Sequence, residues 1–221
     1  MSVPVGQAAE LCVETEVGSI TVTGADVSDC NITAEITVKA ETQEEARKLA
    51  EHVKIEAKPS GDKLSVKVVK PAELKRRKLE VKFKIVAAKH LKVDCSVNVG
   101  SVSVSDMNGR IKVSGNVGSV FCRQVVGDIN LTSNVGSIEV EYADGAAAAC
   151  NATITTNVGS IEFMAPAQLS AQVNASTNVG SVKTDKPITV VGKVGKSVNG
   201  TIGAGEGKIR LKTNVGSIHI K

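Results

Sequence analysis

The chain has 221 residues, with 27 Lys and Arg against 23 Asp and Glu, which gives a formal net charge of +4. This length fits one domain, or one domain with a small companion, and the charge balance excludes a chain that is basic throughout, as dedicated nucleic-acid binders are. Trp is absent, and one Tyr and three Phe are the remaining aromatic residues. The core must therefore be aliphatic, and stacking on nucleobases or sugar rings is disfavoured.

The chain begins with Met1-Ser2-Val3-Pro4, and its first residues lack the basic and apolar segments of a secretory signal. No window of about 18 consecutive apolar residues occurs either, so the sequence predicts no membrane span. The residues alone favour a cytoplasmic protein, or the mature part of an exported one.

Residues 1–90 are expected to form a strand-rich cap with one helix. Strands are predicted over 10–13, 19–23 and 31–39, then a hairpin over 54–69 and a strand over 79–85. Thr42 and Glu45 match a capping box, and the apolar residues that follow share one helical face, which predicts a helix over about 42–53. We expect this helix to cover the N-terminal end of the repeats that follow.

Residues 91–221 are dominated by a repeated Asn-Val-Gly-Ser motif. The motif begins at Asn98, Asn116, Asn134, Asn157, Asn178 and Asn214, so successive copies are 18, 18, 23, 21 and 36 residues apart. We interpret the last interval as two periods with a degenerate copy near residues 196–202. With a weaker copy at residues 16–19, the motif predicts about seven coils.

Apolar and polar residues alternate after each motif, which predicts a strand. Two apolar columns result: Val102, Val120, Ile138, Ile161, Val182 and Ile218, and then Val104, Cys122, Val140, Phe163, Thr184 and Ile220. A second alternating strand precedes each motif, and stacking of the coils would join these columns into one core. The prediction is a mainly β protein: a single-stranded parallel β-solenoid (β-helix), right-handed by analogy with parallel crossovers, continuous with the N-terminal cap.

The motif itself is interpreted as the corner of a coil. Glycine adopts positive φ without a Cβ clash, and asparagine tolerates turns and can form amide ladders between stacked coils. The motif lacks the lysine of a phosphate-binding loop and is no dinucleotide fingerprint. The residues assigned to this turn ladder are Asn98, Gly100, Asn116, Gly118, Asn134, Gly136, Asn157, Gly159, Asn178, Gly180, Asn214 and Gly216.

Glu139 and Glu162 are expected to share one outward column in adjacent coils, about 4.8 Å apart. That separation suits a bound cation or the carboxylate pair of a retaining glycosidase. Lys183 is expected next in this column, where it would relieve the repulsion. The two glutamates are therefore weak metal candidates on a solvated face, and no catalytic residue or cofactor is predicted.

The five cysteines match no zinc or redox spacing. Cys95, Cys122 and Cys150 alternate with apolar neighbours and are interpreted as small core residues. Residues 63–92 are locally basic, with Lys75-Arg76-Arg77-Lys78 as the densest run. This run is a candidate polyanion patch, although the solvent face of an antiparallel sheet is the favoured interpretation.

The final motif runs to the last residue, so the sequence predicts an open edge at Ile218 and Ile220. Such an edge could pair with a second molecule, which predicts a homo-oligomer formed through the solenoid end.

The chain also resembles a known family. The residues that carry the resemblance are Val-Gly-Ser-Ile-Thr-Val at 17–22, Val-Lys-Phe-Lys-Ile at 81–85 and the repeated Gly-Ser-Ile and Gly-Ser-Val units. They are similar to the putative-adhesin β-strand-repeat proteins, domain-of-unknown-function family 4097. The resemblance spans nearly the whole chain and implies a prokaryotic protein of the cell envelope or extracytoplasmic space. It carries over no catalytic residues.

The function expected from the sequence is a non-enzymatic structural or interaction module, adhesin-like, with an envelope polysaccharide or protein as partner and no specific nucleic acid. One alternative is a self-assembling cytoplasmic scaffold resembling the bactofilins. The other is a carbohydrate-active β-helix enzyme.

Overall fold

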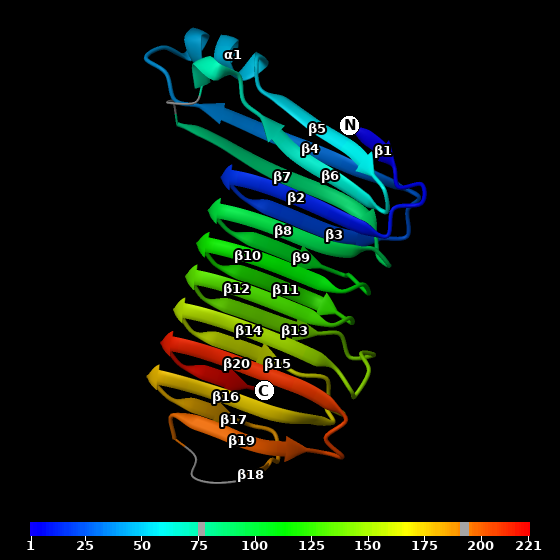
Figure 1. Ribbon diagram of the computed structural model, residues 1–221, viewed down its shortest axis with the longest axis vertical. Helices are drawn as coiled ribbons and strands as arrows, with labels where there is room; N and C mark the ends of the chain where they lie inside the picture. Colours follow the sequence, from blue (N-terminus) through cyan, green and yellow to red (C-terminus); the bar gives the residue numbers. More distant parts are fainter. Residues whose placement is uncertain (75–77, 191–194) are drawn as a thin grey trace.

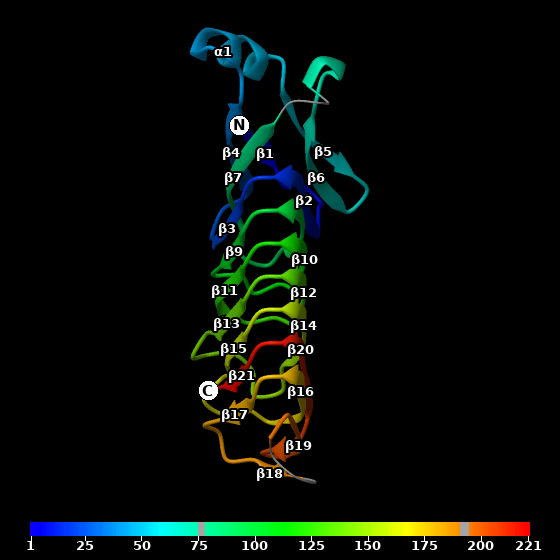
Figure 2. The ribbon, with the colours of Figure 1, turned by 90° about the vertical axis from the view of Figure 1, so that its left-hand side faces the viewer.

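The computed structural model describes residues 1–74, 78–190 and 195–221. Two long, open sheets lie face to face and enclose the core between them (Figures 1 and 2). Sheet A runs from β1 (Ser2–Pro4) to β17 (Val182–Thr184), and sheet B from β18 (Thr189–Val190) to β5 (Lys54–Ser60). Within the described residues, no helix is long and apolar enough to cross a membrane.

Seven coils build the stack, and each gives one strand to each sheet. In spatial order they are β2 (Glu10–Val17) with β3 (Ile20–Ala25), β8 (Lys92–Val99) with β9 (Val102–Ser105), β10 (Ile111–Val117) with β11 (Val120–Val125), β12 (Ile129–Val135) with β13 (Ile138–Tyr142), β14 (Asn151–Val158) with β15 (Ile161–Met164), β20 (Gly207–Val215) with β21 (Ile218–Ile220), and β16 (Ala171–Val179) with β17. Strands of neighbouring coils pair in parallel. The first coil comes from within residues 1–90, so the stack begins before residue 91.

The predicted inward columns form the core. Val102, Ile138 and Ile218 are fully buried or nearly so, as are Val104 and Phe163 in the second column. Register explains this burial, because apolar residues pair with apolar residues of the next coil, as Leu131 does with Ile154. The prediction of a mainly β, solenoid-like stack of repeats is confirmed.

The corners of the coils pack through their backbones. The seven corner glycines have φ between +138° and +150°, a region that favours glycine. A Cβ on Gly136 would lie 2.1 Å from the carbonyl oxygen of Gly118 in the next coil. Where the residue before the motif is Ser or Thr, its hydroxyl donates to such a carbonyl from inside the coil, as at Ser133, Thr156, Thr177 and Thr213. Thr213 Oγ1, for example, lies 2.8 Å from Gly159 O. The distance between coils is therefore set at the corner.

Asparagine side chains form the predicted ladder on the outside of the same corner. Asn116 Nδ2 donates to Asn98 Oδ1 at 3.0 Å, and Asn134 Nδ2 donates to Asn116 Oδ1 at 3.3 Å. Asn178 donates likewise to Asn214. The valine of each motif stays about 40 to 60% exposed, so the corner is an uncharged ridge with its hydrogen bonds along the stack.

The C-terminal motif does not end the stack, and the predicted open edge at Ile218 and Ile220 was wrong. β20 lies between β14 and β16, and β21 lies between β15 and β17. Both isoleucines are fully buried. The inserted coil carries apolar residues in both inward columns, which are best buried with a coil on each side, whereas the outermost coil ends in the more polar Thr184.

Residues 196–202 are not a degenerate coil, so the interpretation of the 36-residue interval was also wrong. They contribute β19 (Ser197–Ile202), which pairs antiparallel with β16, and β18 pairs antiparallel with β19. This antiparallel pair closes the far end of sheet B (Figure 1). The chain thus reverses to make an end and then returns into the stack.

The N-terminal end is closed in a similar way. β7 (Leu79–Ala88) and β6 (Lys63–Val69) add in parallel to the first coil, and β4 (Asp29–Val38) and β5 then add antiparallel. The α1 helix (Gln43–Glu51) lies beyond β4 at this end, and a short 3-10 helix (Ala72–Leu74) follows β6 (Figure 2). The predicted helix is confirmed, with its Thr42 cap accepting from Glu45 N at 3.1 Å.

Replacing Gly136 with Ala tests the corner contact. The new Cβ meets the Gly118 carbonyl at a strained φ, so we expect the free energy of unfolding to fall by at least about 3 kcal/mol, as measured by urea denaturation. Gly145→Ala is the matched control, because nothing lies within 4 Å of its Cβ position. Equal stability of the two variants would contradict the corner contact.

Replacing Ile218 with Ala tests the interior position of the last strand. Truncation of this buried side chain should cost about 2–5 kcal/mol of unfolding free energy and leave the molecular mass in solution unchanged. Urea denaturation and light scattering measure the two quantities. A change of mass at unaltered stability would instead indicate an exposed strand edge.

Candidate functional site

The two sheets diverge at the N-terminal end of the stack (Figure 2). A cleft lies at this end. Two adjoining pockets, of about 460 and 870 Å³, make up this N-terminal cleft. β2 and β6 form one wall, and β4, α1 and the start of β7 form the other. The lining residues are Glu14, Thr15, Glu16, Val17, Thr37, Val38, Lys39, Ala40, Glu41, Thr42, Gln43, Ala46, Lys67, Val68, Lys70, Lys78, Leu79, Glu80 and Val81.

The N-terminal cleft combines buried apolar residues with a charged rim. Leu79, Val81 and Val38 line it and are almost completely buried. They lie there because β7 and β4 extend sheet A beyond the first coil, while β6 extends sheet B at a diverging angle (Figure 2). Val17 also lines the cleft and is 40% exposed, so it offers apolar surface beside the charged rim, a combination typical of a binding site.

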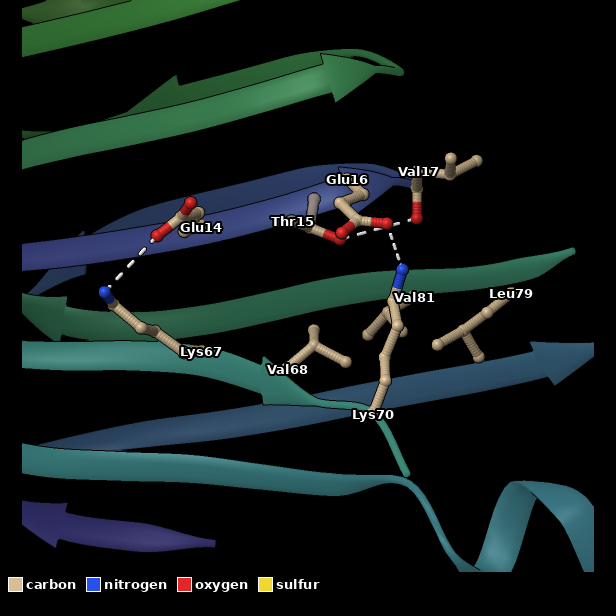
Figure 3. Close-up of a pocket in the computed structure, with 9 residues that line it drawn as sticks. All are labelled: Glu14, Thr15, Glu16, Val17, Lys67, Val68, Lys70, Leu79 and Val81. Carbon is tan, nitrogen blue, oxygen red and sulfur yellow. Dashed lines mark hydrogen bonds and ion pairs between the residues drawn. The ribbon is translucent and has the colours of Figure 1, made fainter. Parts of the chain in front are cut away.

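Two ion pairs join β2 to the adjacent strand β6 and to the residue that follows it, within one wall of the cleft (Figure 3). Lys67 Nζ lies 3.4 Å from Glu14 Oε2, and Lys70 Nζ pairs with Glu16 Oε2. Glu16 and Lys70 belong to both pockets, so their ion pair stands between the two parts of the cleft. A ligand that spans the whole cleft must pass or displace this pair.

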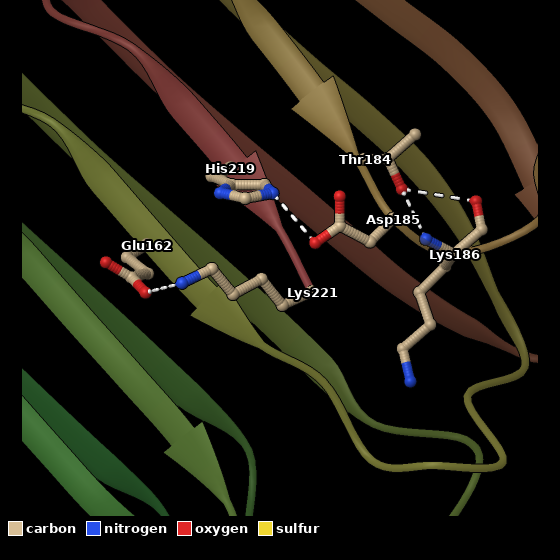
Figure 4. A network of polar contacts seen from close by, with 6 residues as sticks. All are labelled: Glu162, Thr184, Asp185, Lys186, His219 and Lys221. Atoms are coloured by element: carbon tan, nitrogen blue, oxygen red, sulfur yellow. Dashed lines mark hydrogen bonds and ion pairs between the residues drawn. The ribbon is translucent and has the colours of Figure 1, made fainter.

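Glu139 and Glu162 are brought together as predicted, because they are paired in register on β13 and β15. Each carboxylate, however, has its own cation. Arg123 Nη2 lies 3.0 Å from Glu139 Oε1, and Lys221 Nζ pairs with Glu162 Oε1 (Figure 4). The hydrogen bond to Glu162 raises the pKa of Lys221. The charge that would attract a metal ion is therefore compensated, and the described residues hold no group of three or more metal-ligating side chains.

The prediction that Lys183 follows Glu162 in this column was wrong. His219 of the inserted β21 follows Glu162 in the column, and Lys183 lies one strand further along. The Nε2 of His219 lies 3.0 Å from Asp185 Oδ2, and Thr184 Oγ1 accepts from Lys186 N in the adjoining turn (Figure 4). These contacts tie the last strand to its neighbours.

The candidate polyanion patch lies mostly outside the described residues. Lys75, Arg76 and Arg77 are not described, and Lys78 lines the N-terminal cleft. The turn ladder lies along the corner ridge, away from this cleft. Sequence reasoning missed the cleft because its lining comes from four separate stretches of chain with no shared motif.

The five cysteines are all free, and four of them are buried. Burial raises the pKa of the Cys30 and Cys150 thiols to about 11 and that of Cys122 to about 12, and it also raises the pKa of Cys95. Cys12 is partly exposed on the outer face of β2, and burial raises its pKa too. These thiols are protonated at neutral pH, as inert structural cysteines are.

Alkylation tests this assignment. At about pH 8, iodoacetamide should modify Cys12 slowly and leave the buried cysteines intact, as read by mass spectrometry, because a raised pKa lowers the thiolate fraction. In the unfolded chain, Cys30 loses its proton above the ordinary thiol pKa of 9.0. In the folded chain, burial raises the pKa of Cys30 to about 11, so the folded protein keeps this proton over a wider pH range. The free energy of unfolding should therefore fall as the pH rises through this interval. Cys12→Ser is the control, and rapid labelling of Cys95 in that variant would contradict the burial.

The fold and its ends define a class: a repeat-built β protein of solenoid-like coils with an open cleft where its sheets diverge. The chain matches the family model described as Toastrack DUF4097 over residues 1–221, and it belongs to that family. The resemblance stated from the sequence is thereby confirmed.

Solved structures share this architecture at low sequence identity. A putative cell adhesion protein from Clostridium sporogenes matches with a TM-score of 0.57 and 11% identity, over 100% of this chain and 96% of that chain. A putative adhesin from Bacteroides fragilis matches with a TM-score of 0.48 and 16% identity, over 100% and 95% of the two chains. No curated protein matches the sequence. The likeness concerns the fold.

Proposed function

We propose that the protein is a non-enzymatic interaction module of the cell envelope that binds a partner molecule through its N-terminal cleft. The observation that carries this proposal is the cleft itself, with buried apolar residues and a charged rim at the end of a stack whose sides are regular. The printed name of the Clostridium sporogenes neighbour, a putative cell adhesion protein, agrees with such a role.

The pairing of the carboxylates weighs against the carbohydrate-active alternative. A retaining glycosidase needs two carboxyl groups that face the sugar, one of them free to act as nucleophile. Glu139 and Glu162 instead point their oxygens at Arg123 and Lys221. They are also partly exposed on the side of sheet A, and neither lines the N-terminal cleft.

The two ends of the stack weigh against the scaffold alternative. End-to-end assembly of identical coils needs an open parallel strand edge at each end. Here antiparallel strands and α1 stand at one end, and β18 and β19 stand at the other end of sheet B. These segments interrupt the repeat at both ends of sheet B and disfavour continuation by another copy there, whereas sheet A ends at the far side in the parallel strand β17.

The proposal is tested on native cells and on isolated cell envelopes. Protease added to intact cells should digest the protein, and purified protein should sediment with envelope fragments. Lys67→Glu with Lys70→Glu should reduce sedimentation at least about threefold, because both charges at the rim of the cleft are reversed.

Lys54→Glu with Lys84→Glu is the matched control, because both of these lysines lie outside the cleft and the change in charge is the same. Protection in intact cells together with no sedimentation would overturn the proposal. Equal loss in the two double variants would show that net charge, and not the cleft, governs binding.

A further inference from the structure

The inserted strand β20 carries a row of three cations on the outer face of sheet B. Lys208, Arg210 and Lys212 alternate with buried residues, so all three side chains are exposed on the same side of the sheet. Alternate residues of one strand lie about 7 Å apart, which makes this β20 cation row roughly twice that length. The sequence pattern Lys-Ile-Arg-Leu-Lys marks the row.

Two other lysines of sheet B, Lys63 and Lys112, have acidic partners on the neighbouring strand. Lys63 Nζ lies 2.9 Å from Glu10 Oε2, and Lys112 Nζ lies 2.7 Å from Asp94 Oδ2. The β20 cation row differs, because the residues paired with it are uncharged: Asn151, Thr153 and Thr155 on β14, and Gln172, Asn174 and Ser176 on β16. None of the three cations forms an ion pair within the described part of the chain.

Acidic groups near the row do not neutralise it. Asp128 directly precedes β12, which lies beyond β14, and its Oδ1 accepts hydrogen bonds from the backbone and side-chain nitrogens of Asn151 at 3.3 and 3.1 Å. Glu206 immediately precedes β20, is exposed, and forms no ion pair with the row in the described chain. The row therefore keeps its positive charge toward solvent.

Shallow grooves lined by hydrogen-bonding groups flank the β20 cation row. One groove, of about 400 Å³, contains Lys208 and Arg210 and is otherwise lined by Gln172, Val173, Asn174, Asn199, Gly200, Thr201 and Ile209. The other, of about 540 Å³, contains Lys212 and is otherwise lined by Gly115, Thr132, Ser133, Asn134, Thr155, Thr156, Asn157, Asn178 and Asn214. Amides and hydroxyls of this kind can donate to and accept from sugar hydroxyls.

We propose that the β20 cation row and its flanking grooves bind an acidic polysaccharide. A flat, extended face suits a polymer, the cations suit repeated carboxylate, sulfate or phosphate groups, and the amides suit the hydroxyls between those groups. The grooves contain no aromatic side chain, so the stacking that holds single-stranded nucleic acid is missing. The inference goes beyond the proposed function, because it assigns a second site, separate from the N-terminal cleft, and a ligand class for it. It rests on the proposed function for its cellular setting.

The test measures binding of the purified chain to polygalacturonate, with neutral dextran and a single-stranded oligonucleotide as competitors. We expect saturable binding that weakens as salt rises. A triple variant, Lys208→Gln, Arg210→Gln and Lys212→Gln, should bind at least about tenfold more weakly. The matched control replaces Arg47, Lys54 and Lys84 with Gln, which removes three exposed charges from the other end of the stack, outside the N-terminal cleft, and should retain binding. Circular dichroism checks that both variants are folded.

Several outcomes would overturn the proposal. No binding to polygalacturonate would do so, as would equal losses in the triple variant and its control, and stronger competition by the oligonucleotide would assign the row to nucleic acid. If polygalacturonate binding fails while envelope sedimentation persists, the acidic-polysaccharide inference falls and the proposed function stands. If the triple variant loses polygalacturonate binding and the protein is absent from envelopes, the proposed setting falls and the binding site stands.

Discussion

The fold depends on the contact between corner glycines of neighbouring coils. Each corner carbonyl lies where a Cβ on the next glycine would stand, so the coils approach more closely than any other residue would permit. Threonine or serine before the motif donates to the same carbonyls, as Thr156 does to Gly136 at 3.0 Å. Because the close approach of corner glycines recurs along the stack, it fixes the register in which the apolar columns of both sheets meet.

Equivalent corners also allow the chain to depart from sequence order. Gly216 stacks on Gly159, and Gly180 stacks on Gly216, so the last coil fits between two earlier ones without any change of geometry. Residues that precede it in the chain make the antiparallel end of sheet B. The insertion buries Ile218 and Ile220 and places a basic strand between two neutral ones.

In the regular part of the stack, polar side chains form hydrogen bonds and ion pairs with one another. Asparagines bond to asparagines, and Glu139 and Glu162 bond to nearby cations. Surfaces proposed to bind a partner occur where the repeat is interrupted. One is the N-terminal cleft, where the sheets diverge, and the other is the outer face of β20, the strand inserted from the end of the chain. The proposed functions lie at these two places, where the repeat is interrupted.

The sequence by itself determined the class of fold, the strands around each motif, the helix after Thr42 and the inward columns, because these follow from local periodicity and from glycine's freedom at the corner. It also brought Glu139 next to Glu162, since both belong to consecutive repeats. Only the tertiary structure decided the spatial order of the coils, the partners of those glutamates, the N-terminal cleft and the surroundings of Lys208, Arg210 and Lys212. The strand edges of the repeats are equivalent, so the repeat pattern does not specify which coils become neighbours. Contacts between residues far apart in the chain depend on that spatial order and therefore cannot be read from the sequence.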